Sequence, residues 1–593
     1  MADIWRRQCE KVGETRLLPI FIFGLSLLVL SMRITMGVDF MDESYYACFV
    51  DGWLKTGLRD NSNLMIHQTA ELLVYPMVYI FNKIFYANTG LILFLRFIYL
   101  AGALISAICF YCALRQRCDP TKAALIAAVA LNFIPFYMPA PSYNTIAMYA
   151  LLAAMSQFWL YFHSRVESSP ELPHWGLTWP LWLSAIFWVV ACIAYPTMLV
   201  SLLAFFVLSS SAIHGPERRQ QLVRYALICV AAGLFAGALL MNALGVDHLW
   251  NAIQFTNAAS NYSGGAPARI INWFSLFAAH PWFSALSILV VVLSLIRKNL
   301  LVGSRADRLC IGLFLLAILT ATALENPTLY VRSHDVVFLL ALCGFGTFLR
   351  GFKDSSDGAL RLRAALYFVS LMAGIVCSLT ALGGIYNFPI GGLFAACLSL
   401  SNLAVVSSSE TNLLPNGPTR FGNLAGRAVS LAIPFLILTI ITALSATGFY
   451  GQIGKIGYFD AQRIRDGVFA GLRTDSSNLL FIVSLTKAIE KHQTCGNKLL
   501  VLGANPAIYL LTPMSMSALS SWNIGDRDGK NFAIDLQDAF YAHSDNLPDV
   551  IVLSGNEPSL TRFEAKLLSS YFVQSRVQTG INSAAVYVRA DCH

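Results

Sequence analysis

The chain has 593 residues, of which 56% are hydrophobic and only 12% are charged, and its mean hydropathy is +0.60. Soluble globular proteins carry about 25% charged residues, so these values exclude a chain that is soluble throughout and indicate a polytopic membrane protein. The net charge of +8 would suit a nucleic-acid partner, but the distribution of the basic residues, described below, argues against one.

About thirteen apolar runs are long enough to cross or nearly cross a bilayer core of about 30 Å. They lie at about 17–36, 90–114, 122–140, 143–163, 178–194, 196–212, 223–246, 282–297, 308–324, 334–350, 362–384, 388–407 and 428–449. The first run is too long for a typical signal-peptide core and lacks a small-residue cleavage site, so we expect a retained helix. A further run at 69–86 is interrupted by Pro76, Asn82 and Lys83.

The basic residues predict the orientation. If the N-terminus is cytoplasmic and 69–86 does not span, most Lys and Arg residues before position 430 fall in inside loops. The outside loops then hold only Lys55, Arg59, Lys83, Arg269 and Arg332. A span at 69–86 would reverse this pattern, so we expect that segment to lie along the outer surface as an interfacial helix. The positive charge then reflects membrane topology and implies no nucleic acid.

Residues 450–593 form a second predicted domain, on the outer side, after a transmembrane domain at 1–449. The segments NKLLVLG (497–503) and PDVIVLSG (548–555) resemble short parallel strands that end in Gly. The segment 559–572 has helical periodicity, and 583–590 alternates like a closing strand. We expect a small extracytoplasmic α/β domain.

Cysteine usage is informative only in this domain, because the other cysteines lie mostly in apolar runs as small core residues. Cys495 lies just before one predicted strand and Cys592 just after another. In an oxidising compartment they could form a disulfide. Two unpaired thiols are the alternative.

The first outer loop begins with GVDFMDESYY (37–46), which places Asp39, Asp42 and Glu43 directly beside the bilayer. Such acids are often only solvated, but partial desolvation would raise a carboxylate pKa toward that of a general base. Tyr45 and Tyr46 follow, and aromatic rings suit both a membrane interface and sugar stacking. We expect loop 37–89 to carry the centre of the site.

Other outer segments contribute polar and basic groups. The segment ENPTLYVRSHD (325–335) brings Tyr330, Arg332 and His334 to the outer end of a span, and ionisable groups within membrane segments indicate function by default. Snorkelling helix ends or an internal ion pair would also explain them, and the same alternatives hold for Arg96. The loop 247–281 is polar and Gly-rich in part, so we expect it to be mobile and lid-like.

With these features the chain resembles the GT-C superfamily of membrane glycosyltransferases. It is most similar to the branch that contains protein O-mannosyltransferases and the lipid A aminoarabinose transferase. The resemblance rests on DESYY in the first outer loop, LILFLRFIYLAGALISA with its early Arg, and NPTLYVRSHDVVFLLAL. The predicted spans and the C-terminal domain, with ANPAIYLLT and PDVIVLS, agree with it.

The resemblance implies roles for particular residues. Asp42 would be the catalytic carboxylate and Glu43 would assist it. The lipid phosphate and donor would be bound by residues from several loops, namely Arg332, Tyr330, His334, His67, Gln68, Arg96 and Arg269. Contacts to the sugar or acceptor would come from Tyr45, Tyr46, Asp39 and Tyr143. His67 and Gln68 stand where the aminoarabinose branch has a phosphate-binding Lys, a departure that bears on the phosphate contacts of this loop.

The chemistry fits the residues independently. One carboxylate can accept the acceptor's proton during inverting attack on the anomeric carbon. A phosphate leaving group needs cations rather than a second acid. Asp39, Asp42 and Glu43 could bind a divalent metal, but nothing in the sequence supplies a full ligand set, so no cofactor is assigned and metal independence is favoured.

Alternatives from other classes remain. A secondary transporter would show internal repeats and charges near the membrane midplane, and no repeat is apparent. A transferase of whole lipid-linked oligosaccharides, such as an O-antigen ligase, and a partner-binding scaffold are the other two. The favoured interpretation places the protein in a bacterial inner membrane with a periplasmic C-terminal domain. Its partners would be membrane lipids, a polyprenyl-phosphate sugar donor and a glycan, lipid or protein acceptor.

Overall fold

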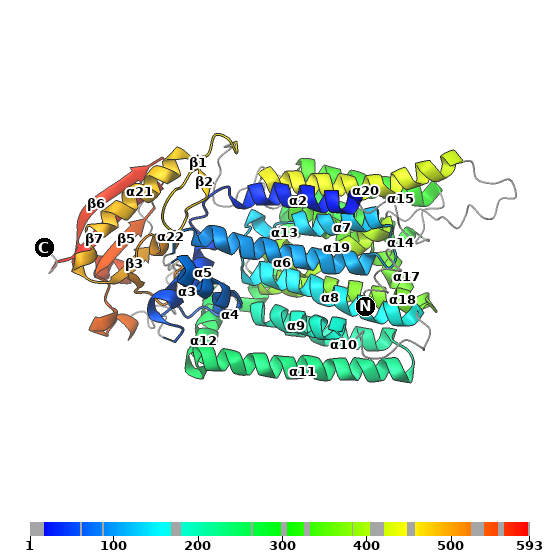
Figure 1. Ribbon diagram of the computed structural model, residues 1–593, viewed down its shortest axis with the longest axis horizontal. Coiled ribbons are helices and arrows are strands. Elements are labelled where there is room, and N and C mark those ends of the chain that lie inside the picture. The colour runs from blue at the N-terminus through cyan, green and yellow to red at the C-terminus, as the bar shows by residue number, and fades with distance from the viewer. Residues whose placement is uncertain are drawn as a thin grey trace.

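The computed structural model describes residues 17–59, 62–85, 88–167, 179–262, 265–297, 305–324, 332–381, 383–403, 420–447, 457–522, 539–555, 562–580 and 582–590. Figure 1 shows two parts, a long bundle of roughly parallel helices and a sheet-containing C-terminal part at one end of the bundle. The helices α3, α4 and α5 lie where the two parts meet.

Each predicted apolar run is occupied by helix. The helices of the bundle are α2 (Leu17–Ile34), α6 (Leu91–Leu114), α7 (Pro120–Asn132), α8 (Tyr143–Glu167), α9 (Trp179–Ala194), α10 (Met198–Ala212), α11 (Pro216–Leu244), α14 (Pro281–Ile296), α15 (Arg305–Leu324), α16 (Arg332–Cys343), α17 (Phe345–Asp354), α18 (Gly358–Thr380), α19 (Phe388–Leu403) and α20 (Arg420–Thr447). The segment predicted as one span at 334–350 contains α16 and α17.

Their lengths and compositions are those of membrane spans. Over the described residues, seven helical segments are long and apolar enough to cross a bilayer, or eight if the bent pair Pro267–Ala279 and Pro281–Ile296 is one span. The axes of that pair meet at 94°. Other apolar helices, such as α7 and α9, are shorter. The chain is therefore a membrane protein, and the count of about thirteen spans stays a prediction.

Burial separates the inner helices from the outer ones. The apolar window of Gly384–Leu403, which includes α19, is 94% buried, whereas that of α11 is 11% buried. α11 exposes large apolar side chains, among them Leu234 and Phe235, which suits contact with lipid. α18 and α19 pack closely because Gly391 faces the backbone of Ala373 and Gly374, where a Cβ atom would clash.

Between α2 and α6 the chain forms α3 (Asp42–Thr56), α4 (Gln68–Leu72) and α5 (Tyr75–Phe85). The run at 69–86 is thus divided between two helices, of which the longer has 11 residues. At about 1.5 Å per residue, neither helix can cross a bilayer core. This agrees with the expectation that the segment does not span, and its placement at a membrane surface stays a prediction.

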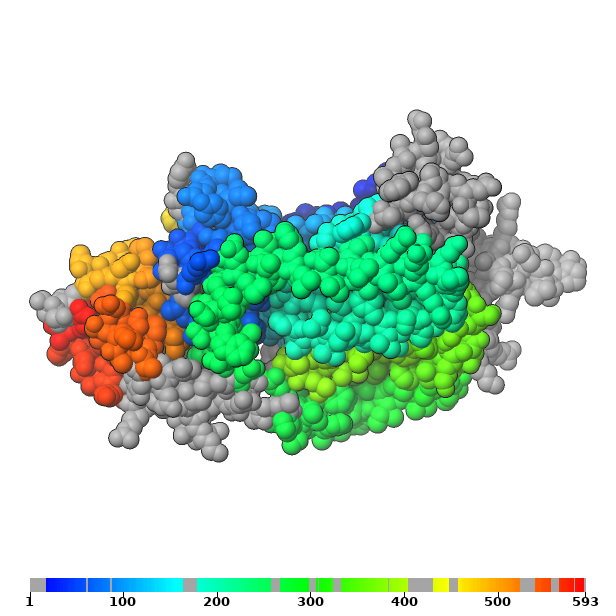
Figure 2. Space-filling view, turned by 90° about the horizontal axis from the view of Figure 1, so that it is seen from below, coloured from blue at the N-terminus to red at the C-terminus, as the bar shows by residue number. Residues whose placement is uncertain are grey.

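The segment 247–281, expected to be a mobile loop, is mostly helical. It contains α12 (Val246–Tyr262) and α13 (Gly265–Ala279). The expectation gave too much weight to the Gly-rich stretch around 264 and too little to the apolar residues at helical spacing on either side. Figure 2 shows α12, in green, at the end of the α11 surface and close to the blue segment that holds α3 to α5.

The C-terminal part contains a five-stranded sheet with the order β4-β3-β5-β7-β6. The strands are β3 (Lys498–Leu502), β4 (Ser515–Met516), β5 (Val550–Ser554), β6 (Tyr571–Thr579) and β7 (Asn582–Arg589), and a two-stranded sheet is formed by β1 (Gln462–Arg463) and β2 (Arg473–Thr474). β3 is parallel to β5, whereas β7 is antiparallel to both β5 and β6. The predicted strands at 497–503, 548–555 and 583–590 are confirmed, and β6 was not predicted.

The helices of this part are α21 (Ser476–Glu490), α22 (Ala507–Leu510) and α24 (Arg562–Leu568), the last of which lies within the predicted helical segment 559–572. Short 3-10 turns are η1 (Pro135–Tyr137), η2 (Gly384–Asn387), η4 (Gln493–Cys495) and η5 (Ser544–Asn546). Cys495 is disulfide-bonded. Its expected partner Cys592 lies outside the described residues, and so does the predicted domain boundary at 449/450.

The C-terminal part packs directly on the first outer loop. The backbone N–H of Ala507 donates to the Phe40 carbonyl at 3.2 Å. The Lys55 ammonium donates to the carbonyls of Tyr509 and Thr512 at 3.1 and 2.7 Å. Phe40 also shares a hydrophobic core with residues of α21 and β3. The C-terminal part thereby fixes the position of α3 relative to the bundle.

Candidate functional site

Asp39 shapes the backbone that leads into α3. Its carboxylate accepts hydrogen bonds from the backbone N–H groups of Met41 and Glu43, at 2.8 and 2.9 Å. Burial, with the charges of Asp42 and Glu43 nearby, raises the pKa of Asp39 to about 7. Both carboxylate oxygens are engaged in holding the turn, which argues for a structural role rather than direct contact with a substrate.

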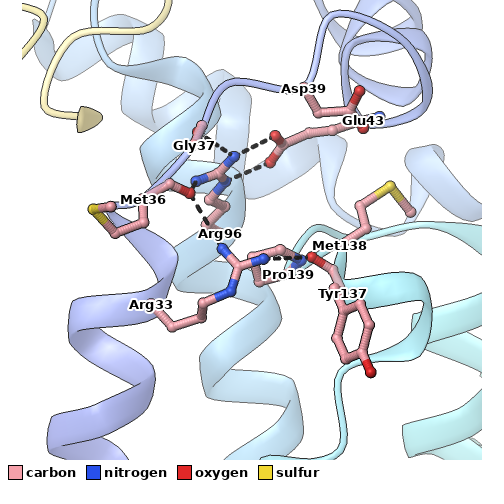
Figure 3. Close-up of a pocket in the computed structure, with 9 residues that line it drawn as sticks. All are labelled: Arg33, Met36, Gly37, Asp39, Glu43, Arg96, Tyr137, Met138 and Pro139. Atoms are coloured by element: carbon pink, nitrogen blue, oxygen red, sulfur yellow. Dashed lines mark hydrogen bonds and ion pairs between the residues drawn. The ribbon is translucent and has the colours of Figure 1, made fainter. Parts of the chain in front are cut away.

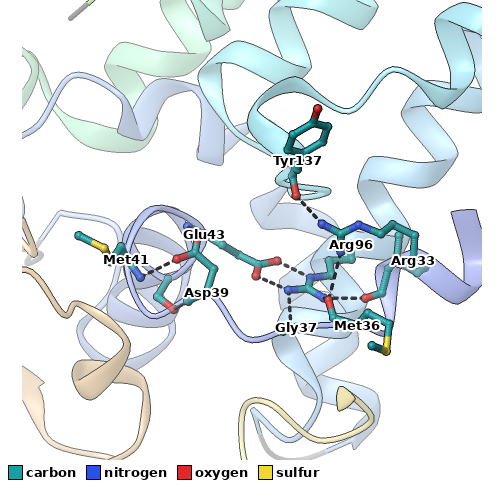
Figure 4. A network of polar contacts seen from close by, with 10 residues as sticks. Arg33, Met36, Gly37, Asp39, Met41, Glu43, Arg96 and Tyr137 are labelled. Carbon is teal, nitrogen blue, oxygen red and sulfur yellow. Dashed lines mark hydrogen bonds and ion pairs between the residues drawn. The ribbon is translucent and has the colours of Figure 1, made fainter. Parts of the chain in front are cut away.

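Glu43 and Arg96 form a buried ion pair at the start of α6 (Figures 3 and 4). The Arg96 guanidinium donates to both Glu43 carboxylate oxygens at 2.6 Å. Its remaining hydrogen bonds go to the carbonyls of Ile34, Met36 and Gly37, at 2.8 to 3.0 Å. All N–H donors of the guanidinium are therefore used within the protein. This arrangement argues against Arg96 as a phosphate ligand and against Glu43 as a base.

Arg33 lies beside Arg96 (Figure 3) and connects three elements. It donates to the carbonyls of Ser445 in α20, Met36 after α2, and Tyr137 in η1, at 3.1, 3.2 and 2.6 Å. Both arginines line a cavity of about 10 Å³, which has room for about one water molecule. This cavity is too small for a sugar or a phosphate, so the two arginines do not form a binding pocket for either in this structure.

The turn η1 has strained backbone. Phe136 and Tyr137 have φ values of 53° and 54°, which is unusual for non-glycine residues. Nε2 of His334 accepts a hydrogen bond from the Phe136 backbone N–H at 3.2 Å, and its ring packs on Phe133 and Phe136. Because Nε2 is an acceptor here, His334 holds the turn in place and does not present a cation to a phosphate.

The position of Tyr143 is fixed at the start of α8. Ser142 and Thr145 exchange hydrogen bonds between side chain and backbone N–H, at 2.9 and 3.2 Å. This reciprocal arrangement satisfies donors that the first turn of a helix leaves unpaired. These hydrogen bonds fix the direction in which the chain continues from the strained turn into α8, and with it the position of Tyr143.

Aromatic rings from three segments gather around Tyr143. The His67 ring stacks on it with a centroid distance of 4.3 Å and an interplanar angle of 11°. Tyr46 and Tyr195 approach it with centroid distances of 6.0 and 5.1 Å. The Tyr45 hydroxyl is hydrogen-bonded to His67 Nδ1 at 3.1 Å. Stacked rings with polar edges form the kind of surface that binds a sugar ring.

Burial determines the charge states in this cluster. It lowers the pKa of His67 to about 4 and raises the pKa of both Tyr45 and Tyr46 well above the usual value. His67 is therefore neutral at pH 7. It can stack on a ring and exchange a hydrogen bond with a neighbour, but it does not supply positive charge for the phosphate contact that the sequence suggested.

Groups of opposite charge, Asp42 and Arg269, act on Tyr143. Asp42 is half-buried at the first residue of α3, and its charge acts on the hydroxyls of Tyr45, Tyr46 and Tyr143. The half-buried Arg269 of α13 also acts electrostatically on Tyr143 and donates to the Thr380 carbonyl at 2.8 Å. The structure thus brings Asp42 and Arg269 to the same aromatic cluster.

The remaining predicted residues are Arg332, Tyr330 and Gln68. Arg332 is half-buried at the start of α16, and its charge acts on Tyr137 rather than on Tyr143. Tyr330 lies outside the described residues. Gln68, at the start of α4, is fully buried and accepts a hydrogen bond from His248 at 3.0 Å through its side-chain oxygen. Gln68 thus belongs with the aromatic cluster, one residue after His67.

Sequence reasoning did not single out several residues of the site. Glu71 is fully buried in α4, Tyr195 packs on Tyr143, and His248 contacts Gln68. The sequence MIHQTAELL contains one signal that points to Glu71. Its carboxylate lies next to apolar residues in a short helix, where it is costly to bury. Within the described ranges, no group of three His, Cys, Asp or Glu residues is arranged to hold a metal ion.

No known sequence family matches the chain, and no characterised protein matches it by sequence. Solved structures resemble it in fold. The oligosaccharyltransferase of Archaeoglobus fulgidus tethered with an acceptor peptide matches with a TM-score of 0.51 and 10% identity, covering 97% of this chain and 74% of that one. The same enzyme in complex with Zn and sulfate matches with a TM-score of 0.50 and 11% identity, covering 96% and 73%.

ArnT from Cupriavidus metallidurans in the apo state was also found, with a TM-score of 0.47 and 11% identity, covering 96% of this chain and 97% of that one. The likeness to the oligosaccharyltransferase establishes the architecture: the chain shares the fold of that membrane enzyme.

Proposed function

We propose that the protein transfers a monosaccharide from a polyprenyl-phosphate carrier to an acceptor on the outer face of a bacterial inner membrane. The observation that supports this proposal is that a carboxylate, Asp42, and a guanidinium, Arg269, both act electrostatically on Tyr143 of the aromatic cluster. A carboxylate that accepts a proton and a cation that stabilises the departing phosphate are what attack on a phosphosugar requires.

Asp42 is the best candidate for the base among the three acids of the loop. Asp39 holds the backbone of the turn, and Glu43 is held by Arg96. Asp42 is half-buried at the first residue of α3, and it is the acid of the three to which we assign the role of proton acceptor.

The reaction would proceed by inversion. The acceptor hydroxyl oxygen bonds to the anomeric carbon while the bond from that carbon to the phosphate oxygen breaks, and its electron pair leaves with the phosphate. The hydroxyl proton passes to Asp42. Arg269 stabilises the polyprenyl phosphate that departs. Arg332, at the start of α16, and Tyr330, two positions before it in the sequence, are a second pair of candidate phosphate contacts.

The architecture supports the orientation predicted from charge. The loop with α3, the turn η1 and the C-terminal part all lie at one end of the bundle (Figure 1). With the N-terminus cytoplasmic, that end faces the periplasm, where the flipped lipid-linked sugar is available. The lipid chain would approach past the apolar outer surfaces of the bundle.

A second candidate is the transfer of a whole lipid-linked oligosaccharide. The likeness to an oligosaccharyltransferase that was solved with a tethered acceptor peptide favours it. The two candidates use the same bond exchange and differ in the length of the glycan. Transfer assays with carriers that bear one sugar or several sugars separate them.

The test of the base is Asp42→Asn in the purified full-length protein, assayed with a panel of polyprenyl-phosphate sugars. We expect transfer to fall by about 10²–10⁴-fold, because an amide cannot accept the proton. Binding of undecaprenyl phosphate should be retained. Asp545→Asn, at an exposed site in the C-terminal part, is the matched control and should keep full activity. Full transfer by Asp42→Asn would move the base to another residue.

A further inference from the structure

A buried carboxyl group in α4 has no hydrogen-bond partner in the structure. Glu71 has no exposed surface, and neither of its side-chain oxygens has a partner. Gln68 lies one helical turn earlier, and half of its side-chain amide is also without a hydrogen-bond partner. Its oxygen accepts a hydrogen bond from His248, whereas its Nε2 is buried without one. Residues three apart on a helix share one face.

Unpartnered buried polar groups are unfavourable, and native proteins rarely keep them. Glu71 is not needed to hold α4 in place. This helix has only five residues, and Thr69 anchors it, because the Thr69 hydroxyl donates to the Ile193 carbonyl at 2.7 Å. An apolar residue at position 71 would serve that packing better. Glu71 and Gln68 therefore have donors and acceptors that suit a bound ligand.

The position of these groups connects them to the aromatic cluster. The charge of Glu71 would act on the hydroxyls of Tyr45 and Tyr46. His67, which stacks on Tyr143, immediately precedes Gln68. Trp53 of α3, whose indole N–H is also buried without a partner among the described residues, packs on Tyr75, the first residue of α5. Polar atoms without a partner therefore occur in α4 and in the neighbouring α3.

The chemistry of these groups selects the ligand. Burial raises the pKa of Glu71 well above its ordinary value and so favours the neutral carboxyl, which can both donate and accept a hydrogen bond. The free Gln68 Nε2 adds a donor. Neighbouring hydroxyls of a sugar ring each donate and accept, which matches this set, whereas a phosphate would call for a cation. Resting on the proposed function, we propose that Glu71 and Gln68 form the subsite that binds hydroxyl groups of the transferred sugar.

The test compares lipid binding by the full-length wild type, Glu71→Gln and Glu71→Leu. The probes are undecaprenyl phosphate alone and undecaprenyl phosphate that carries one of several hexoses or pentoses. We expect wild type to bind at least one sugar-bearing lipid more tightly than the bare lipid. Glu71→Leu should reduce that preference about tenfold or more, as expected for lost hydroxyl contacts, and Glu71→Gln should retain part of it. Binding of the bare lipid should be unchanged.

Thermal unfolding without lipid provides the second readout. Glu71→Leu should keep or raise the Tm, because it removes a carboxyl group without a partner from the interior. A lowered Tm with an unchanged sugar preference would mean that Glu71 has a structural role through bound water, and would overturn the inference. If sugar preference survives in Glu71→Leu, the subsite is wrong but the proposed function stands. If wild type binds neither kind of lipid, both are wrong.

Discussion

Arg96 shows how a single residue can look functional in the sequence and have another role in the structure. A charged side chain in an apolar run indicates a lipid-phosphate contact or an internal ion pair. The structure shows the ion pair, with Glu43 located 53 positions earlier. No periodicity or spacing predicts a pairing over that distance. The same contact explains why two adjacent acids, Asp42 and Glu43, differ in their surroundings and in their proposed roles.

The ion pair should matter for stability far more than a surface pair does. Arg96→Gln leaves the Glu43 carboxylate buried without a cation, and removal of one partner of a buried pair costs about 3–5 kcal/mol. The same substitution at Arg589, whose pair with Asp549 is partly exposed, should cost at most about 1 kcal/mol. Thermal unfolding of both variants in the same detergent checks this. Equal Tm values for the two variants would show that Arg96 and Glu43 do not depend on each other.

The sequence predicted some helices and strands correctly and misjudged one segment that contributes to the site. Long apolar runs are readable because a bilayer demands about 20 apolar residues, and β3 and β5 are readable because buried parallel strands are short β-branched runs that end in Gly. The segment 247–281 was misjudged. Its glycines suggested a loop, yet α12 and α13 form on either side of them and carry His248 and Arg269 into the site. Arg269 could not be ranked above Arg332 from sequence, since only the fold shows which one approaches Tyr143.

Packing between α18 and α19 depends on a glycine. Gly391→Ala would place a Cβ atom against the backbone of Ala373 and Gly374, so the helices must separate. We expect a loss of about 1–3 kcal/mol, as for other overpacked sites. In α6, Gly102 has no atom within 4 Å of its would-be Cβ. Gly102→Ala should therefore raise stability by up to about 1 kcal/mol through helix propensity. A Tm rise for both variants would contradict the close packing.

The whole molecule brings together segments that lie far apart in the chain. The C-terminal part supports α3 through Phe40 and Lys55, α2 and α20 are joined through Arg33, and α13 carries Arg269 to Tyr143. The sequence predicted a GT-C architecture with a site in the first outer loop, and the fold confirms the architecture.

The most direct test is an experimental structure of the full-length protein with undecaprenyl phosphate bound. The account predicts the phosphate in contact with Arg269, on the side of Tyr143 that faces Asp42, with the lipid chain leaving along the bundle. The ion pair of Arg96 with Glu43 should be intact in that complex. A phosphate bound away from the Tyr143 cluster, with Asp42 directed into bulk solvent, would contradict the assignment of this site as the centre of glycosyl transfer.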